Sequence, residues 1–182
     1  MKMNWPNRLT IMRICLVPVF VIFLLYDIGG SAHTVIAGII FIIASLTDTL
    51  DGYLARKNNQ ITVFGKFMDP LADKLLVCSA LIGLVELGRI PGWIVMVIVG
   101  RDFIISGFRL VAAERGTVIA ASWWGKIKTV VQMIMVIFLV FHLPGKFFAA
   151  AERILIWSAL ALTVISLADY LYKNKNVLQE VH

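Results

Sequence analysis

The sequence predicts an all-α integral membrane protein in which six transmembrane helices form one compact bundle. Its 182 residues are 60% hydrophobic and only 15% charged, whereas soluble domains are about half apolar and about a quarter charged. Six mostly apolar stretches reach or approach the roughly 20 residues that a membrane-spanning helix needs. These stretches are residues 8–27, 34–56, 64–87, 91–114, 124–143 and 149–172.

Short breaks rich in glycine, proline and asparagine separate the stretches and predict where each helix ends. The breaks are residues 27–31, 57–60, 88–92, 115–117 and 143–145. Because these connections are short, we expect a single domain over residues 1–182, with no soluble part. A tryptophan and a proline precede the first span, within residues 3–6, and are typical of a short N-terminal segment at the membrane interface.

The first stretch resembles a signal peptide in that basic residues precede it. Its apolar run is long, however, and Arg13 lies inside it, which favours a span with a residue that faces a cavity. The two cysteines, Cys15 and Cys78, lie in apolar runs and offer neither a disulfide framework nor a zinc spacing. We therefore expect the first stretch to remain as a membrane helix.

Basic residues are distributed unequally between the two sets of loops. One set carries Lys2, Arg8, Arg56, Lys57, Lys66, Arg115, Lys126, Lys128, Lys173 and Lys175, and the other carries only Arg89, Lys146 and Arg153. By the positive-inside rule the first set is cytoplasmic, and six spans return both termini to that side. The net charge of +6 then fits anionic lipid headgroups and a phosphorylated substrate, with no role for nucleic acid.

Four aspartates stand in and beside the second and third predicted spans. Their pattern is Asp48-x2-Asp51-Gly52-x2-Ala55-Arg56-x8-Gly65-x3-Asp69-x3-Asp73. The spacings i, i+3 and i, i+4 put each pair on one helix face, so two antiparallel helices could aim all four at one point. Carboxylates near the hydrocarbon core need compensating cations, and oxygen ligands select Mg²⁺ or Mn²⁺. The alternative is that the aspartates are solvated loop charges or helix caps.

At these residues the chain resembles the CDP-alcohol phosphotransferase family, integral membrane enzymes that join a CDP-linked lipid to an alcohol. The resemblance implies that Asp48, Asp51 and Asp69 hold two Mg²⁺ ions, with Mn²⁺ possible, and that Asp73 lies near or on the second metal and acts as general base. It also places the CDP-linked lipid against a further set of residues. These are Asn7, Thr10, Asp48, Gly52, Ala55, Arg56, Thr62, Gly65 and Asp69. The family further implies a homodimer. The charge bias of the loops puts the aspartates at the cytoplasmic ends of their spans, so we expect a bacterial inner-membrane protein whose active site faces the cytoplasm.

The small residues and the arginine of this pattern fit a nucleotide site for physical reasons. Gly52, Ala55 and Gly65 would let a ligand approach the helix backbone, although they also suit ordinary packing between membrane helices. The planar guanidinium of Arg56 matches phosphate geometry, although it also suits a cytoplasmic topology charge. The aspartates beside these residues favour the nucleotide site in each case.

A second polar set lies in and after the fourth span and predicts a basic pocket for an anionic acceptor. It consists of Arg101, Asp102, Arg109, Lys126 and Lys128. Arg101 and Asp102 lie about ten residues into an apolar span, too deep for loop charges. Four cations exceed what one carboxylate balances, and recognition of a phosphate by arginine explains the excess. The alternative is a structural ion pair between Asp102 and Arg109, which share a helical face.

Three further motifs are similar to those of family members that transfer the phosphatidyl group from CDP-diacylglycerol to sn-glycerol 3-phosphate. They are Pro6-Asn7-x-Leu9-Thr10-x2-Arg13, Asp69-Pro70-Leu71-Ala72-Asp73-Lys74 and Gly125-Lys126-Ile127-Lys128-Thr129. One departure is Gly100-Arg101-Asp102, where those members carry Ala-Arg-Glu. Other acceptors remain open, namely inositol phosphate, serine or phosphatidylglycerol, and the basic pocket argues against serine. A cation transporter that uses the aspartates is a further alternative.

Overall fold

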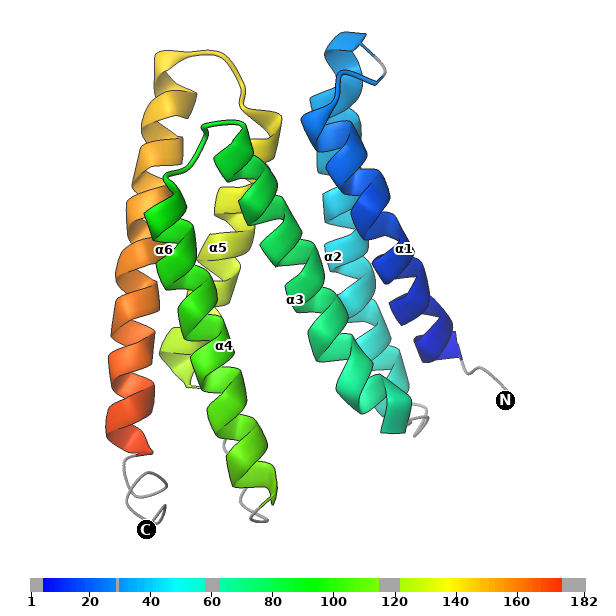
Figure 1. Cartoon of the computed structure of the whole chain (residues 1–182), viewed down its shortest axis with the longest axis vertical. Coiled ribbons are helices and arrows are strands. Elements are labelled where there is room, and N and C mark those ends of the chain that lie inside the picture. The colour runs from blue at the N-terminus through cyan, green and yellow to red at the C-terminus, as the bar shows by residue number, and fades with distance from the viewer. Residues whose placement is uncertain (1–4, 29, 58–62, 115–121, 175–182) are drawn as a thin grey trace. The chain divides into compact units, whose positions relative to one another are not determined.

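The computed structural model describes residues 5–28, 30–57, 63–114 and 122–174, where it contains six α-helices, one 3-10 helix and no strand (Figure 1). Side chains are described outside residues 5–7, 31, 48–57 and 63–67. The elements are α1 (Trp5–Leu25), η1 (Gly30–Ala32), α2 (His33–Lys57), α3 (Val63–Glu86), α4 (Gly92–Glu114), α5 (Trp123–Phe141) and α6 (Lys146–Lys173). Each predicted span overlaps one α-helix, with no boundary more than three residues away. The all-α prediction is confirmed for this part of the chain.

Two compact units make up the described chain. The first combines Met1–Arg89 with Leu139–His142, and the second combines Ile90–Phe138 with Leu143–His182. Helix α1 begins at Trp5, so the predicted interfacial segment over residues 3–6 runs into the first helix, and its earlier part lies outside the described residues.

In the first unit, α1 packs against both α2 and α3. The buried rings of Phe20 on α1 and Phe41 on α2 lie with their centroids 5.6 Å apart. Gly83 on α3 permits close approach of α1, because a Cβ there would lie 2.7 Å from Cδ2 of Leu24. Small residues at such contacts are typical of membrane helices, which associate mainly through close packing.

In the second unit, α4 packs against α6. Buried residues of α6 recur every three or four positions and form one face: Glu152, Ile156, Ala159, Thr163, Ser166 and Tyr170. Aromatic pairs lie along the two helices, Trp93 with Trp157 at a centroid distance of 6.2 Å and Phe108 with Tyr170 at 6.3 Å. The buried face of α6 therefore carries hydroxyl groups as well as apolar side chains.

The turn after α3 is determined by Gly88, which has a φ of 66°. Its amide donates to the carbonyl of Val85 at 2.9 Å, and the amide of Arg89 donates to that of Leu84 at 2.9 Å. This pattern is a Schellman motif, whose left-handed position favours glycine. The side chain of Arg89 then donates to the carbonyls of Leu139 and Val140, both at 2.9 Å, and so caps the end of α5.

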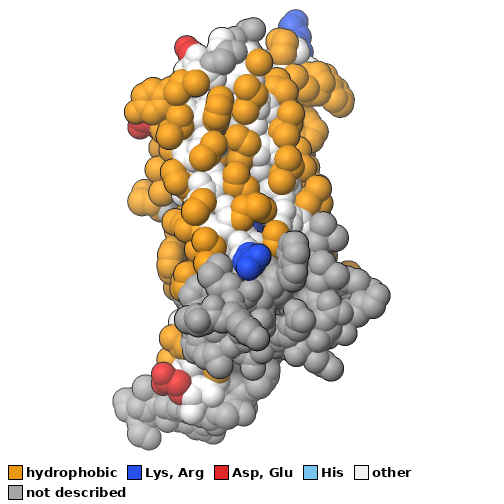
Figure 2. Space-filling model, turned by 90° about the vertical axis from the view of Figure 1, so that its right-hand side faces the viewer, with side chains coloured by type: hydrophobic (Ala, Val, Ile, Leu, Met, Phe, Trp, Pro, Cys, Tyr) orange, Lys and Arg blue, Asp and Glu red, His pale blue; other side chains and the backbone are white. Residues whose placement is uncertain are grey.

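The surface of the described helices is strongly apolar. Three helical segments are long and apolar enough to cross a membrane, namely Arg8–Leu25, Trp123–Phe141 and Lys146–Lys173. Figure 2 shows one face, on which the described side chains are mostly hydrophobic. Exposed residues of α1 and α2 include Ile11, Met12, Ile22, Ile39 and Ile43. A surface of this kind is stable in lipid and promotes association in water, so the fold is that of a helical membrane protein.

Candidate functional site

The four predicted metal ligands lie on two successive helices of the first unit. Asp48 and Asp51 belong to the last part of α2, where side chains are not described, and Asp69 and Asp73 belong to α3. The latter two are half-buried and one turn apart, so they share a face of α3. The structure thus describes half of the predicted carboxylate set, and the convergence of all four stays a prediction.

Thr10 joins two of the predicted site elements. Its side chain is buried, and its hydroxyl donates to Oδ1 of Asp69 at 2.5 Å. The two residues are 59 positions apart in the sequence, on α1 and α3. A residue predicted to contact the CDP-linked lipid therefore orients a residue predicted to bind metal.

Arg13 is a polar residue of the first unit that the predicted site does not include. It lies one turn after Thr10, it is 1% exposed, and its Nε donates to the carbonyl of Ala44 on α2 at 3.1 Å. Ala44 lies one turn before Asp48 along the same helix. Its position, a charged residue inside an apolar run, predicted a side chain that faces a cavity. The contact with α2 was not predicted.

The described carboxylates suit a hard divalent cation by their chemistry. Asp69 and Asp73 offer only oxygen ligands, and one oxygen of Asp69 already has a hydroxyl donor that fixes the carboxylate. Within the described side chains, which do not include those of Asp48 and Asp51, no group of three or more potential ligands is found. The residues present fit a Mg²⁺ site as far as they are described.

The remaining predicted contacts of the CDP-linked lipid lie mostly where side chains are not described. Gly52, Ala55 and Arg56 belong to the last turns of α2, and Gly65 belongs to the first turn of α3. Asn7 is in the first turn of α1. Thr62 lies outside the described residues, and these six predictions remain untested in geometry.

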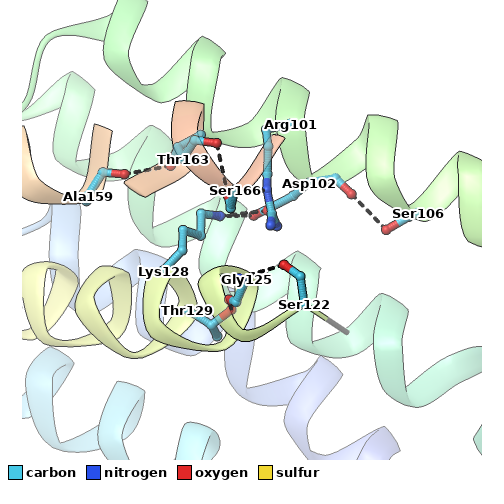
Figure 3. A network of polar contacts seen from close by, with 10 residues as sticks. All are labelled: Arg101, Asp102, Ser106, Ser122, Gly125, Lys128, Thr129, Ala159, Thr163 and Ser166. Carbon is cyan, nitrogen blue, oxygen red and sulfur yellow. Dashed lines mark hydrogen bonds and ion pairs between the residues drawn. The ribbon is translucent and has the colours of Figure 1, made fainter. Parts of the chain in front are cut away.

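The second unit contains a buried ionic cluster centred on Asp102, which we call the Asp102 cluster (Figure 3). Lys128 donates to both carboxylate oxygens, at 2.6 and 2.7 Å, and Nη1 of Arg101 donates to Oδ1 at 2.9 Å. The side chains of Lys128 and Arg101 are 1% and 10% exposed. One carboxylate therefore bonds to two buried cations, and these three side chains together carry a net charge of +1.

The alternative to the acceptor pocket, a structural ion pair of Asp102 with Arg109, is wrong. Among the described residues, Asp102 pairs with Arg101 and Lys128, and Arg109 is exposed near the end of α4. Seven residues place two side chains on one face of a helix but about 10 Å apart along its axis. Lys128 comes from α5 and reaches the carboxylate directly, so the tertiary contact replaces the pair along the helix.

The predicted acceptor pocket therefore separates into buried and exposed residues. Arg101 and Lys128 are joined through Asp102, while Arg109 and Lys126 are exposed. Sequence analysis did not identify Ser166 of α6, whose Oγ accepts a hydrogen bond from Nε of Arg101 at 3.1 Å. The signal available in the sequence was the pair of polar residues at positions 163 and 166, within an apolar stretch of this helix.

The sequence model of the family described as CDP-alcohol phosphatidyltransferase matches residues 3–165. A Bacillus subtilis protein named CDP-diacylglycerol–glycerol-3-phosphate 3-phosphatidyltransferase is 47% identical, over 97% of each chain. A Haemophilus influenzae protein of the same name is 43% identical over 98% of this chain and 97% of its own. A Mycobacterium tuberculosis protein named probable phosphatidylglycerophosphate synthase is 44% identical over 92% and 79%.

Because Lys128 bonds directly to Asp102, we expect substitutions of these two residues to have non-additive effects on stability. Asp102→Asn leaves two buried cations without their carboxylate and is expected to cost about 3 kcal/mol of unfolding free energy. Lys128→Met removes one cation while keeping most of the side-chain volume. We expect the double variant to be more stable than the sum of the single effects by about 1 kcal/mol or more. Unfolding in detergent measures all three variants, and additive losses would contradict the bridge.

Proposed function

Because this chain belongs to the CDP-alcohol phosphatidyltransferase family, we propose that it transfers the phosphatidyl group from CDP-diacylglycerol to sn-glycerol 3-phosphate and releases CMP. The observation that carries the proposal is the similarity to relatives whose names state both substrates, over nearly the whole chain. The Asp102 cluster supports the phosphorylated acceptor, since it holds one buried positive charge in excess. Family membership also makes the chain an enzyme, and the transporter alternative is abandoned.

We assign to the four aspartates the binding of the metal ions that contact the pyrophosphate of the CDP-linked lipid. Asp48, Asp51, Asp69 and Asp73 would hold two Mg²⁺ ions, or Mn²⁺, which would neutralise the carboxylates and screen the phosphate charge. Thr10 orients Asp69 through its hydrogen bond. Asp73, half-buried one turn later, takes the proton from the acceptor hydroxyl.

The CDP-linked lipid is assigned to residues on either side of these aspartates. Asn7, Gly52, Ala55, Arg56, Thr62 and Gly65 would contact it, together with Thr10, Asp48 and Asp69. Glycine and alanine leave room along the helix backbone for the nucleotide. The guanidinium of Arg56 pairs with a phosphate oxygen.

The acceptor phosphate is assigned to the second unit. Arg101 and Lys128 are buried, so their charges act at low dielectric and are little screened by salt. Arg109 and Lys126 are exposed and would attract the anion from the aqueous side. The phosphate brings the negative charge that the Asp102 cluster lacks, which an unphosphorylated acceptor such as serine does not.

We further propose the arrangement in the membrane. One domain over residues 1–182 crosses the bacterial inner membrane six times, with both termini and the active site on the cytoplasmic side. The bias of lysine and arginine toward one set of loops supports this orientation. The enzyme is proposed to act as a homodimer, as the family resemblance implies.

An acceptor panel tests the proposed reaction. Purified protein is supplied with CDP-diacylglycerol, Mg²⁺ and one acceptor at a time: sn-glycerol 3-phosphate, inositol phosphate, serine, phosphatidylglycerol or glycerol. Release of CMP and the lipid product are followed together. We expect efficient transfer to sn-glycerol 3-phosphate alone, because glycerol leaves buried charges unpaired. Faster transfer to another acceptor would overturn the named product and leave the family assignment intact.

Replacement of a metal-binding aspartate by asparagine is expected to nearly abolish turnover. In Asp69→Asn the amide oxygen still accepts the hydrogen bond of Thr10, so the change removes charge with little change in packing. The same loss is expected for Asp48→Asn and Asp51→Asn. Asp27→Asn is the control, since Asp27 is exposed beyond the end of α1. Retention of more than about a tenth of the wild-type rate at saturating Mg²⁺, a barrier change under about 1.4 kcal/mol, would refute the metal assignment.

Asp73→Asn is expected to separate catalysis from binding. If Asp73 is the general base, its loss lowers kcat by about 100-fold or more. CDP-diacylglycerol should still bind, because the nucleotide contacts belong to other residues. Calorimetric titration of the variant measures this, and complete loss of nucleotide binding would move Asp73 to a purely metal-binding or structural role.

Buried and exposed cations are expected to differ in their dependence on salt. Arg101→Lys keeps the charge but loses the planar fork, and should raise the KM for sn-glycerol 3-phosphate about tenfold, or about 1.4 kcal/mol, at any salt concentration. Arg109→Ala and Lys126→Ala should raise the KM for sn-glycerol 3-phosphate about threefold, and this effect should decrease as the salt concentration increases. The KM for CDP-diacylglycerol serves as the internal control. Normal acceptor kinetics in all three variants would remove these residues from the acceptor site.

A further inference from the structure

The guanidinium of Arg101 is held on two sides by different helices. Its Nε donates to Oγ of Ser166 on α6 at 3.1 Å, and its Nη1 donates to Asp102 on its own helix at 2.9 Å. The arginine is 9% exposed and the serine is fully buried. These two contacts restrict both the position and the rotation of the planar group (Figure 3).

Toward Arg101, Ser166 can act only as a hydrogen-bond acceptor, because its hydroxyl hydrogen is used by the backbone of α6. A hydroxyl has one hydrogen to donate, and that of Ser166 goes to the carbonyl of Thr163 at 3.0 Å. The lone pairs of Oγ are therefore presented to Arg101. Thr163 has the same burial, but its own hydroxyl donates to Ala159 at 2.6 Å and has no bond to the arginine.

The third nitrogen of the guanidinium lies against Gly125 of α5. A Cβ at this glycine would be 3.2 Å from Nη2 of Arg101 and 3.4 Å from Oγ of Ser122. No hydrogen bond in the described part of the chain involves Nη2. Nη2 is also not one of the buried atoms without a partner in this part of the chain, which belong to Gln132, Asp169 and Tyr170. It is therefore accessible to a ligand at the place where glycine leaves room for it.

We propose that Ser166 and Gly125 are positioning residues for the acceptor: Ser166 holds Nε, and Gly125 leaves the space in which Nη2 of Arg101 meets the acceptor's phosphate. The inference rests on the proposed function. Neither residue touches the substrate in this arrangement, and both act through Arg101. Their loss is expected to affect the acceptor and to spare the CDP-linked lipid.

Two matched pairs of variants test the proposal. Ser166→Ala removes the hydroxyl that holds Arg101, whereas Thr163→Val removes a hydroxyl of equal burial on the same helix that bonds only to its own backbone. Gly125→Ala adds a Cβ against Nη2, whereas Gly107→Ala adds one where nothing lies within 4 Å. Each control changes the same kind of group as its partner: a hydroxyl is lost in the first pair and a Cβ is gained in the second.

We expect Ser166→Ala to raise the KM for sn-glycerol 3-phosphate about fivefold or more and Gly125→Ala to raise it about threefold. Both controls should stay within about twofold of wild type. For all four variants, kcat and the KM for CDP-diacylglycerol should also stay within about twofold, since a general loss of structure would change those as well. Equal behaviour of Ser166→Ala and Thr163→Val, or a joint rise of both KM values, would overturn the positioning role. Should Ser166→Ala fail to fold, the Gly125 pair decides.

Direct binding separates this inference from the proposed function. Titration calorimetry with sn-glycerol 3-phosphate in detergent needs no turnover, and the weaker binding expected for Ser166→Ala and Gly125→Ala is measured against their controls. If wild type binds this compound but does not transfer to it, the reaction is wrong and the positioning role still holds. If wild type transfers normally and the variants bind as wild type does, the positioning role alone is wrong. Failure of the wild type to bind any phosphorylated acceptor overturns both.

Discussion

The carboxylate of Asp102 makes a positive site possible inside an apolar unit. An ion taken out of water costs several kcal/mol even after relaxation, and the second unit buries both Arg101 and Lys128. Asp102 bonds to both cations and lies at 26% side-chain exposure, close enough to the surface to remain reachable by a solute. The three side chains together carry a net charge of +1, so stability and the proposed recognition of an anion depend on the same three residues.

In the first unit, two of the described contacts join a charged side chain to a neutral group. The buried hydroxyl of Thr10 donates to Asp69, and the buried guanidinium of Arg13 donates to the backbone of α2. Both contacts start from one face of α1, which packs against α2 and α3. Polar groups thus face other helices while isoleucine, valine and leucine cover the outside. Lipid solvates that outer surface well and the polar interior poorly, which explains the division.

Much of the fold followed from the sequence because helix ends have strong local causes. Apolar stretches separated by glycine and proline predicted all six α-helices, and the left-handed Gly88 stops α3 where expected. The aspartate pattern is likewise local, since i, i+3 and i, i+4 spacings set a common face on any helix. Arg101 and Asp102 were identified from their depth in an apolar stretch, which is also a property of the chain alone.

The sequence by itself determined the helices, the membrane character, the aspartate pattern and the excess of positive charge. Only the tertiary structure decided which of these residues meet. It paired Asp102 with Lys128 of α5 instead of Arg109, buried two of four predicted acceptor cations, and brought Ser166 to Arg101 across 65 residues. Such partners depend on how helices pack and rotate against one another, and that packing is a sum of many weak contacts that no local pattern encodes.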